Sequence, residues 1–423
     1  MPQKLEQKTK TELTASQVDA FQKFSKLKVG ALFMKMGTGK TRVAVEIVNY
    51  NNPDFLLYIA PFSTIDNVTA ELEKWGIKCK YKVIGYETIA SSDKKYIEIL
   101  NELDKYETNF IIADESIFIK NGKTNRFNRC RILRQKCKYA LILNGTPIVK
   151  NERDIYNQMQ FLSEKIFGMN YWTFMNTFFT HTIKKVNGRE AHIYNFYEEN
   201  RAAFIKIIKP YIFDADLDFK KVIKMDYRFV SYKSSEYEEV KHKILAKYIN
   251  YDTNSFIELF NALNHVSATY IKKNEVVAEY IKDRQVICYC NYIDEIEQIA
   301  GLCDCYVITG QTQAKDRKAI LEQFKNDKKP LLLTMGVGAY SLNLQFCNEI
   351  VYSSVSFNYG NYEQSKYRIK RLGQKNDIKY VHILSETGIN NMIIDNLTSK
   401  KSLSDIINDA LQNGQIEDLI KKL

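Results

Sequence analysis

Apolar runs and helical stretches alternate along the first 150 residues of the chain. The apolar runs, which predict buried strands, are Val29–Met34, Phe55–Ala60, Tyr81–Ile84, Phe110–Ala113 and Ala140–Leu143. Helices are predicted between them at Thr41–Tyr50 and Val68–Trp75. Buried strands that alternate with helices form a parallel sheet with crossover connections. Residues 1–150 are therefore expected to form one α/β domain.

A second series of the same kind begins near residue 285. Its predicted strands are Val286–Tyr289, Cys305–Thr309, Leu331–Thr334, Glu349–Tyr352 and Tyr380–Leu384. Its predicted helices are Ile293–Leu302, Lys315–Phe324 and Tyr362–Arg371. The same pattern predicts a second α/β domain over residues 281–400.

The stretch between the two series, residues 151–280, follows a different pattern. It is rich in aromatic residues and its periodicity is mostly helical, so we expect a helical insertion that ends in a linker. Two extended runs in Thr182–Phe196 flank Asn187-Gly188, and this dipeptide predicts a β-hairpin. The tail, residues 401–423, has apolar positions at helical spacing. We expect a C-terminal helix packed on the second domain, with a partner-binding helix as the alternative.

The side chains of the insertion leave two questions open. The hairpin carries Lys184, Lys185 and Arg189, which could touch a nucleic-acid backbone or could keep exposed edge strands from aggregating. The aromatic residues could be base-stacking platforms, but their spacing fits helix packing better. These aromatic residues are Phe161, Phe167, Tyr171, Trp172, Phe174, Phe178 and Phe179.

Composition and charge narrow the class of protein. The 423 residues are 45% hydrophobic and 26% charged, which is typical of a globular chain. The net charge of +11 favours an anionic partner such as nucleic acid, although many basic proteins bind none. The N-terminus is polar, and no run approaches the ~18 apolar residues of a membrane span. We therefore expect no membrane association and a cytoplasmic location, which would be the host cytoplasm for a viral protein.

The eight cysteines predict no disulfide framework in a long chain without a secretion signal. Two C-x-C pairs, Cys288/Cys290 and Cys303/Cys305, could suggest a zinc site. Both pairs lie in strand-like runs, where positions i and i+2 face the same side. Small cysteines buried in the core explain this spacing better.

A glycine-rich segment follows the first predicted strand and opens a helix. Glycines let backbone N–H groups close around phosphate oxygens, and the helix N-terminus adds a positive partial charge. The lysine can reach the β- and γ-phosphates, and the threonine after it can bind Mg²⁺. The strict P-loop pattern has glycine where this chain has Met34, but the strand before and the helix after supply the context. The predicted nucleotide-binding residues are Gly37, Thr38, Gly39, Lys40 and Thr41.

A pair of acidic residues, Asp114-Glu115, ends the run Phe110–Ala113. Two carboxylates at the carboxyl end of a strand, downstream of a P-loop, suit an ATPase. Asp114 would hold Mg²⁺ through its coordination shell. Glu115 would orient and polarise the attacking water.

Several segments resemble those of superfamily 2 helicases, specifically the SNF2-like group, and they follow that family's order. Gln17 resembles the adenine-reading glutamine. In the first half the other matching segments are YIAPFSTIDNVTAELEKW (58–75), GYETI (85–89), DESIFIKN (114–121) and LILNGTP (141–147). In the second half they are TMGVGAYSLNL (334–344) and QSKYRIKRLGQ (364–374).

The block at 364–374 is the most specific of these matches, because its Gln, Arg, Arg, Gly and Gln all fall at the family's spacing. A helix there would place Arg368 and Arg371 on one face. The resemblance implies that these arginines reach the ATP site, with Arg371 as an arginine finger and Arg368 as a support. Gln364, at the start of the block, is assigned to ATP binding.

The resemblance implies two RecA-like parallel-sheet domains in tandem, separated by the helical insertion and followed by the C-terminal helix. It also implies ATP as the nucleotide, Mg²⁺ as the metal ion and nucleic acid as the partner. Backbone contacts are expected at Pro61, Thr64, Lys120, Gly145, Thr146, Thr334 and Asn343.

This chain also departs from the family pattern at several positions. Ser116 stands where alanine or glycine is usual, and Asn144 replaces a threonine in a segment that couples hydrolysis to movement. Residues 339–341 interrupt a glycine-rich block, and 210–219 occupies the place of a double-arginine block. The large helical insertions of chromatin remodellers are absent, so the resemblance is to compact phage or bacterial members.

The leading hypothesis is a monomeric ATP-hydrolysing motor that translocates on duplex DNA. It would remodel DNA or protein–DNA complexes, such as replication or recombination intermediates. One alternative is a strand-separating helicase on single-stranded DNA or RNA. A second alternative is an ATP-gated nucleic-acid clamp with little turnover. The polymer that stimulates ATP turnover discriminates among the three.

Overall fold

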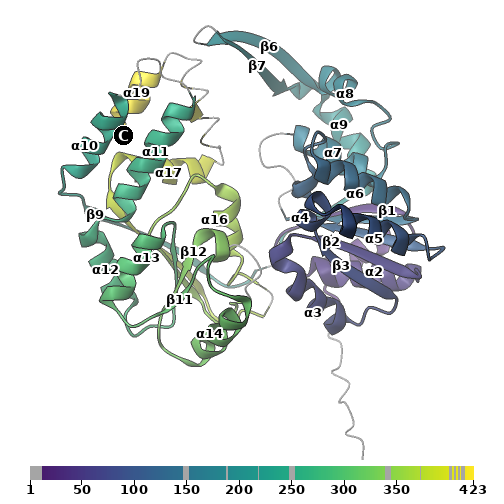
Figure 1. Cartoon of the computed structure of the whole chain (residues 1–423), viewed down its shortest axis with the longest axis horizontal. Coiled ribbons are helices and arrows are strands. Elements are labelled where there is room, and N and C mark those ends of the chain that lie inside the picture. Colours follow the sequence, from purple (N-terminus) through teal and green to yellow (C-terminus); the bar gives the residue numbers. More distant parts are fainter. Residues whose placement is uncertain are drawn as a thin grey trace, which may run out of the picture. The chain divides into compact units, whose positions relative to one another are not determined.

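The computed structural model describes residues 12–145, 152–186, 189–217, 219–246, 253–338, 344–371, 373–399, 403, 406–407, 410 and 415–423. It divides into two compact units (Figure 1). Unit 1 comprises Met1–Thr180 and Tyr194–Leu217, and unit 2 comprises His181–Ile193 and Asp218–Leu423. Residues 151–280 are thus shared between the two units, because their helices and strands complete both cores.

Unit 1 is built on a six-stranded parallel sheet in the order β3-β2-β4-β5-β1-β8. Its strands are β1 (Val29–Met34), β2 (Phe55–Ala60), β3 (Lys80–Gly85), β4 (Asn109–Asp114), β5 (Tyr139–Leu143) and β8 (Ile212–Ala215). Its helices are α1 (Ala15–Phe24), α2 (Lys40–Asn51), α3 (Ile65–Trp75), α4 (Tyr86–Ser91), α5 (Asp93–Leu103), α6 (Asn125–Gln135), α7 (Arg153–Leu162), α8 (Tyr171–Phe178) and α9 (Arg201–Ile208).

Alternate residues of these strands point to opposite faces of the sheet, and each face has its own core. On one face, α1, α2 and α3 pack against Leu32, Tyr58 and Ile112. On the other face, α4 to α9 pack against Ala31, Ile59 and similar neighbours. Burial in these two cores explains why the apolar runs predicted β1 to β5 to within a residue or two, whereas the edge strand β8 was not predicted.

The insertion's aromatic residues belong mainly to the second of these cores. Phe161, Phe167, Phe174, Phe178 and Phe179 are buried and Tyr171 is partly buried there, so the prediction of helix packing is confirmed for them. Trp172 is the exception, because 61% of it is exposed.

A two-stranded hairpin of β6 (Phe179–Val186) and β7 (Arg189–Phe196) is present where Asn187-Gly188 predicts it. The turn itself lies outside the described residues. So do the side chains of Lys184, Lys185 and Arg189, and both interpretations of their charge stay open.

Unit 2 has a second six-stranded parallel sheet, in the order β11-β12-β10-β13-β14-β9. Its strands are β9 (Ile223–Ser231), β10 (Ile287–Cys290), β11 (Tyr306–Ile308), β12 (Leu331–Thr334), β13 (Glu349–Tyr352) and β14 (Ile378–Glu386). Its helices are α10 (Glu236–Leu245), α11 (Thr253–Ala268), α12 (Ile271–Ile281), α13 (Ile293–Leu302), α14 (Ala314–Asn326), α15 (Met335–Gly338), α16 (Tyr359–Lys366), α17 (Gly388–Ser399) and α19 (Ile416–Lys421).

The two faces of this sheet are also covered by helices. Cys288, Cys290 and Cys303 are buried with α12 and α13 in one core, and Cys305 packs against it. The prediction that these cysteines fill the core is therefore confirmed. The tail contributes Ile407, Leu419 and Leu423 to the core on the other face, as the apolar spacing predicts.

Candidate functional site

The loop between β1 and α2 has the backbone that its glycines allow. Gly37 and Gly39 have φ angles of 80° and 83°, in the left-handed region that side chains disfavour. A Cβ added to Gly39 would lie 2.4 Å from Nε2 of Gln17. The loop therefore needs glycine at position 39 for conformation and for space.

The lysine of this loop lies beside the segment that follows β5. Its ammonium donates to the Met34 carbonyl at 2.9 Å. A Cβ on the buried Gly145 would come within 3.6 Å of the Lys40 ammonium and 3.3 Å of Met36 Cγ. Gly145 is thus placed against the phosphate-binding loop, while Thr146 lies outside the described residues.

Gln17 holds the phosphate-binding loop in this structure. It is buried, its Nε2 donates to the Thr38 carbonyl at 2.8 Å, and its Oε1 accepts from the Thr14 N–H at 3.0 Å. Contact with adenine stays a prediction for this residue.

Asp114 and Thr41 both lie near the hydroxyl of Tyr58. Tyr58 donates to Asp114 Oδ2 at 3.0 Å; burial and the Asp114 carboxylate raise the pKa of Tyr58 well above its ordinary value, and the nearby Thr41 opposes that rise. Burial raises the pKa of the Asp114 carboxyl, and the nearby Lys40 ammonium opposes that rise. The carboxylate and the hydroxyl are the hard oxygen donors that Mg²⁺ prefers, so these residues fit the ion.

Glu115 follows with a backbone unusual for its type, at φ 48° and ψ 55°. Its N–H donates to Asp114 Oδ1 at 2.9 Å. The carbonyl of Asp114 accepts a hydrogen bond from the Tyr86 hydroxyl at 2.7 Å. The next residue, Ser116, donates to Oε1 of Gln158 on α7 at 2.6 Å, with both side chains fully buried. The Asp114 carboxylate and the backbone that carries Glu115 are therefore held by hydrogen bonds from both sides of the strand end.

Lys120 connects the same segment to α7. Its ammonium lies 3.4 Å from Asp154 Oδ2, and its carbonyl accepts from Asn157 Nδ2 at 2.7 Å. Contact of Lys120 with nucleic acid stays a prediction. For this contact the Lys120 ammonium would have to leave Asp154 or bind a phosphate while it stays paired with Asp154.

The segment after β2 combines buried and exposed positions. Pro61 is buried, and its carbonyl accepts from the Thr64 hydroxyl at 2.8 Å. Phe62 is 64% exposed, and its N–H donates to Glu87 Oε2 at 2.9 Å. Nucleic-acid contact by Pro61 and Thr64 stays a prediction.

The predicted arginine helix is wrong in its extent. Helix α16 ends at Lys366, and the chain turns through Arg368 and Arg371 before β14. The turn is stabilised locally, because Arg371 Nε donates to the Tyr367 carbonyl at 2.8 Å and Ile369 is fully buried. Arg368 is itself only 6% exposed.

The other predicted residues of unit 2 are placed only in part. Gln364 lies on α16, partly exposed, and Thr334 ends β12 in a partly buried position. Residues 339–341 and Asn343 lie outside the described chain.

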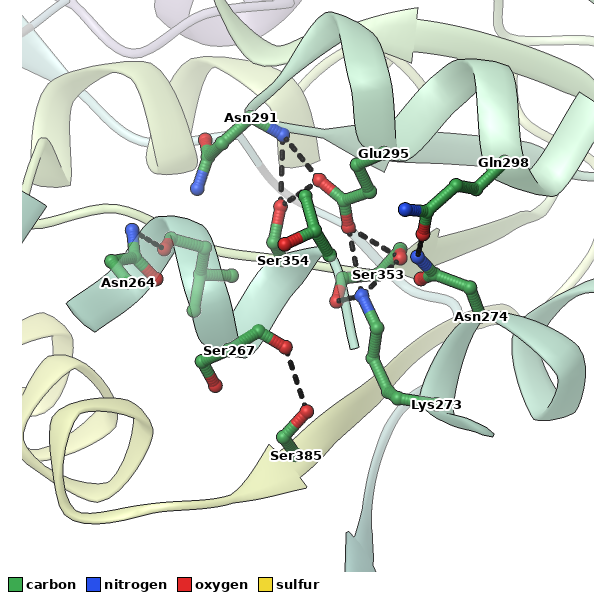
Figure 2. A network of polar contacts seen from close by, with 12 residues as sticks. Asn264, Ser267, Lys273, Asn274, Asn291, Glu295, Gln298, Ser353, Ser354 and Ser385 are labelled. Carbon is green, nitrogen blue, oxygen red and sulfur yellow. Dashed lines mark hydrogen bonds and ion pairs between the residues drawn. The ribbon is translucent and has the colours of Figure 1, made fainter. Parts of the chain in front are cut away.

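A buried polar network, which no motif predicted, joins the carboxyl ends of β10 and β13 (Figure 2). Lys273 of α12 donates to Glu295 Oε1 of α13 at 2.9 Å, and both side chains are fully buried. The hydroxyls of Ser353 and Ser354 each donate to Glu295 at 2.6 Å. The network fixes the start of the segment that leads into α16.

Tyr58 and Tyr86 lie in segments that resemble the family, but the contacts made by Tyr58, Tyr86 and Gln158 were not predicted. Their partners are 56, 28 and 42 positions away, and a tyrosine in an apolar run or a glutamine on a helix is ordinary. Their role becomes clear only from their arrangement around Asp114 and Glu115, which depends on the fold.

Comparison with known families agrees with this architecture. The SNF2-related domain matches residues 76–266, and the helicase conserved C-terminal domain matches residues 272–373. The SNF2-related match begins after the phosphate-binding loop, so that loop is supported by its own geometry and by the longer similarities to single proteins.

Three such proteins are similar over most of this chain. The nuclear protein STH1/NPS1 of Saccharomyces cerevisiae is 22% identical over 92% of the chain. An uncharacterized ATP-dependent helicase of Mycoplasma pneumoniae is 22% identical over 88%. The DNA annealing helicase and endonuclease ZRANB3 of Bos taurus is 21% identical over 91%. The chain spans only 34%, 40% and 39% of their respective lengths.

The yeast and the Mycoplasma relative are equally identical to this chain and both are much longer than it, so these similarities do not establish a compact phage or bacterial type. In this chain the SNF2-related match precedes the helicase C-terminal match, in the order of units 1 and 2. The chain belongs to the SNF2 family of superfamily 2, the ATP-dependent helicases and ATPases.

Proposed function

We propose that the chain is an ATP-driven motor that translocates along duplex DNA and remodels DNA or protein–DNA complexes. The observation that carries the proposal is the carboxylate pair at the end of β4. Asp114 accepts from the Tyr58 hydroxyl, lies near Thr41 and the Lys40 ammonium, and is followed by Glu115, whose N–H donates to Asp114 Oδ1. These groups are of the kind that hydrolysis of a nucleoside triphosphate uses, and their proximity supports the proposal.

Each group has a definite part in ATP hydrolysis. The N–H groups of the loop and the Lys40 ammonium bind the phosphates. Thr41 and Asp114 would hold Mg²⁺, which, when bound, neutralises charge on the phosphate oxygens. Glu115 orients the attacking water and accepts its proton. Arg371, supported by Arg368, is proposed to stabilise charge on the γ-phosphate.

We propose duplex DNA as the polymer. The net charge of +11 suits a polyanion, and one relative is named a DNA annealing helicase. Contacts through Pro61, Thr64 and Gly145 would be to the phosphate backbone, which carries no sequence information. We propose a compact phage or bacterial type that acts as a monomer in the cytoplasm. Within the described chain no helix has the length and apolar character to cross a bilayer.

Steady-state ATP turnover tests this proposal. It is measured without polymer and with duplex DNA, single-stranded DNA or RNA, each at low and moderate salt. We expect strong stimulation by duplex DNA that weakens as salt rises, and loss of turnover in Lys40→Ala and Arg371→Ala. Stimulation by single strands alone would favour the strand-separating helicase. Tight ATP binding without stimulated turnover would favour the clamp.

A further inference from the structure

The backbone at Glu115 needs support from its surroundings. At φ 48° it lies in the left-handed region, where the Cβ of an L-residue is crowded. Among the described residues, the other non-glycine positions with positive φ are Asn52 and Asp283. Asparagine and aspartate tolerate this region, whereas glutamate has no such preference. A residue in this state persists only when its neighbours hold it.

One of the hydrogen bonds around Glu115 acts directly on the strained peptide. The carbonyl of Asp114 belongs to the peptide plane whose rotation sets φ of Glu115. That carbonyl accepts from the Tyr86 hydroxyl at 2.7 Å. The bond therefore limits the rotation that would relax Glu115 into the common α or β regions.

Tyr86 is itself held firmly. It is fully buried, and its ring stacks on Phe118 with a centroid distance of 5.5 Å and an interplanar angle of 8°. Burial raises the pKa of its hydroxyl well above the ordinary value, so it remains a donor at neutral pH. A buried tyrosine hydroxyl needs a partner, and the Asp114 carbonyl meets that need.

The next residue of α4 contacts a different segment. Glu87 accepts the N–H of Phe62 at 2.9 Å, within the segment 61–64 that is predicted to touch nucleic acid. Helix α4 thus contacts that segment through Glu87 and the catalytic strand end through Tyr86. A movement of residues 61–64 on binding a polymer would reach Glu115 through this one short helix.

We propose that Tyr86 is a positioning residue that holds Glu115 in its hydrolytic conformation, and that α4 links this restraint to the segment 61–64. The inference rests on the proposed function. Tyr86 is proposed to act through the Asp114 carbonyl and not through contact with ATP or the attacking water.

The test compares Tyr86→Phe with Tyr156→Phe in the full chain. Tyr156 is a matched control because it is buried in unit 1 and its hydroxyl also donates to a carbonyl, that of Met169, at 2.9 Å. Each variant loses one hydrogen bond from a tyrosine hydroxyl to a backbone carbonyl and keeps its ring. The measurements are kcat and KM for ATP with and without duplex DNA, together with the melting temperature.

For Tyr86→Phe we expect kcat with duplex DNA to fall about tenfold, with KM for ATP changed less than about twofold. Tyr156→Phe should keep the wild-type kcat, and the two variants should melt at similar temperatures. Wild-type kcat in Tyr86→Phe, or an equal loss in Tyr156→Phe, would overturn the inference. A wild type that no polymer stimulates would instead count against the proposed function, so the two failures are distinguishable.

Discussion

Removal of the Lys273 ammonium tests how the network in Figure 2 stabilises unit 2. Its three protons are used by Glu295 Oε1 at 2.9 Å, the Ser353 hydroxyl at 2.9 Å and the Ser353 carbonyl at 3.0 Å. Lys273→Met would leave a fully buried carboxylate without its counter-ion. Breaking such a pair costs about 3–5 kcal/mol. Because Ser353, Ser354 and the Asn291 N–H still donate to Glu295, we expect a cost near the lower end, about 3 kcal/mol.

The second half of the test is the double variant Lys273→Met/Glu295→Leu. It removes both charges, and replacing a buried pair by apolar residues is often nearly neutral. The double variant should therefore regain about 1–2 kcal/mol relative to Lys273→Met, the rest being lost to the orphaned serine hydroxyls.

Urea denaturation of the full chain measures both effects. Trp75 and Trp172 are the only two tryptophans and both lie in unit 1, so their fluorescence follows unit 1 while circular dichroism follows the whole chain. A loss of about 3 kcal/mol would lower the urea midpoint of unit 2 by roughly 1–3 M. A double variant as unstable as Lys273→Met would refute the reasoning, because the cost would not come from the unpaired charge.

Three further predictions concern single residues. Gly39→Ala should abolish ATP binding in a filter or fluorescence assay, because it adds a Cβ at φ 83° and 2.4 Å from Gln17; wild-type affinity would contradict this. Ser116→Ala should destabilise unit 1 by about 1–3 kcal/mol in urea, since it removes the hydrogen bond that the buried Gln158 Oε1 accepts from Ser116. Burial lowers the pKa of His382 to about 3, so the unfolded chain binds a proton that the folded chain does not. The free energy of unfolding should therefore fall as pH drops from about 6.5 towards 3. This fall should be smaller in His382→Asn, and it should be as large as in the wild type in His242→Asn, the control at an exposed histidine.

The sheets were predictable because most of their strands are buried on both faces and appear as apolar runs. The two missed strands, β8 and β9, lie at sheet edges. In β9 the apolar side chains Ile223, Met225 and Phe229 are 38–44% exposed and alternate with polar residues, so no apolar run marks it. The end of α16 was not predicted correctly because the chain after it is fixed by burial of Ile369. Local helix propensity carries no information about such a tertiary contact.

The candidate site divides in the same way. Lys40, Asp114 and Glu115 were predictable because short segments at fixed places along the chain carry them. The hydrogen bonds of Tyr86 and Gln158 were not predictable, because each joins residues that are far apart in the sequence. Ser116 shows the limit most clearly, because a departure from the family pattern becomes intelligible only beside Gln158 on α7.

Displacement of a third strand from a DNA triplex with a duplex arm reports ATP-driven movement along duplex DNA. We predict that the wild type displaces the third strand with ATP, that removal of the duplex arm abolishes displacement, and that Glu115→Gln binds the DNA without displacing it. Displacement by Glu115→Gln, or DNA-stimulated ATP turnover by the wild type without displacement, would contradict the account.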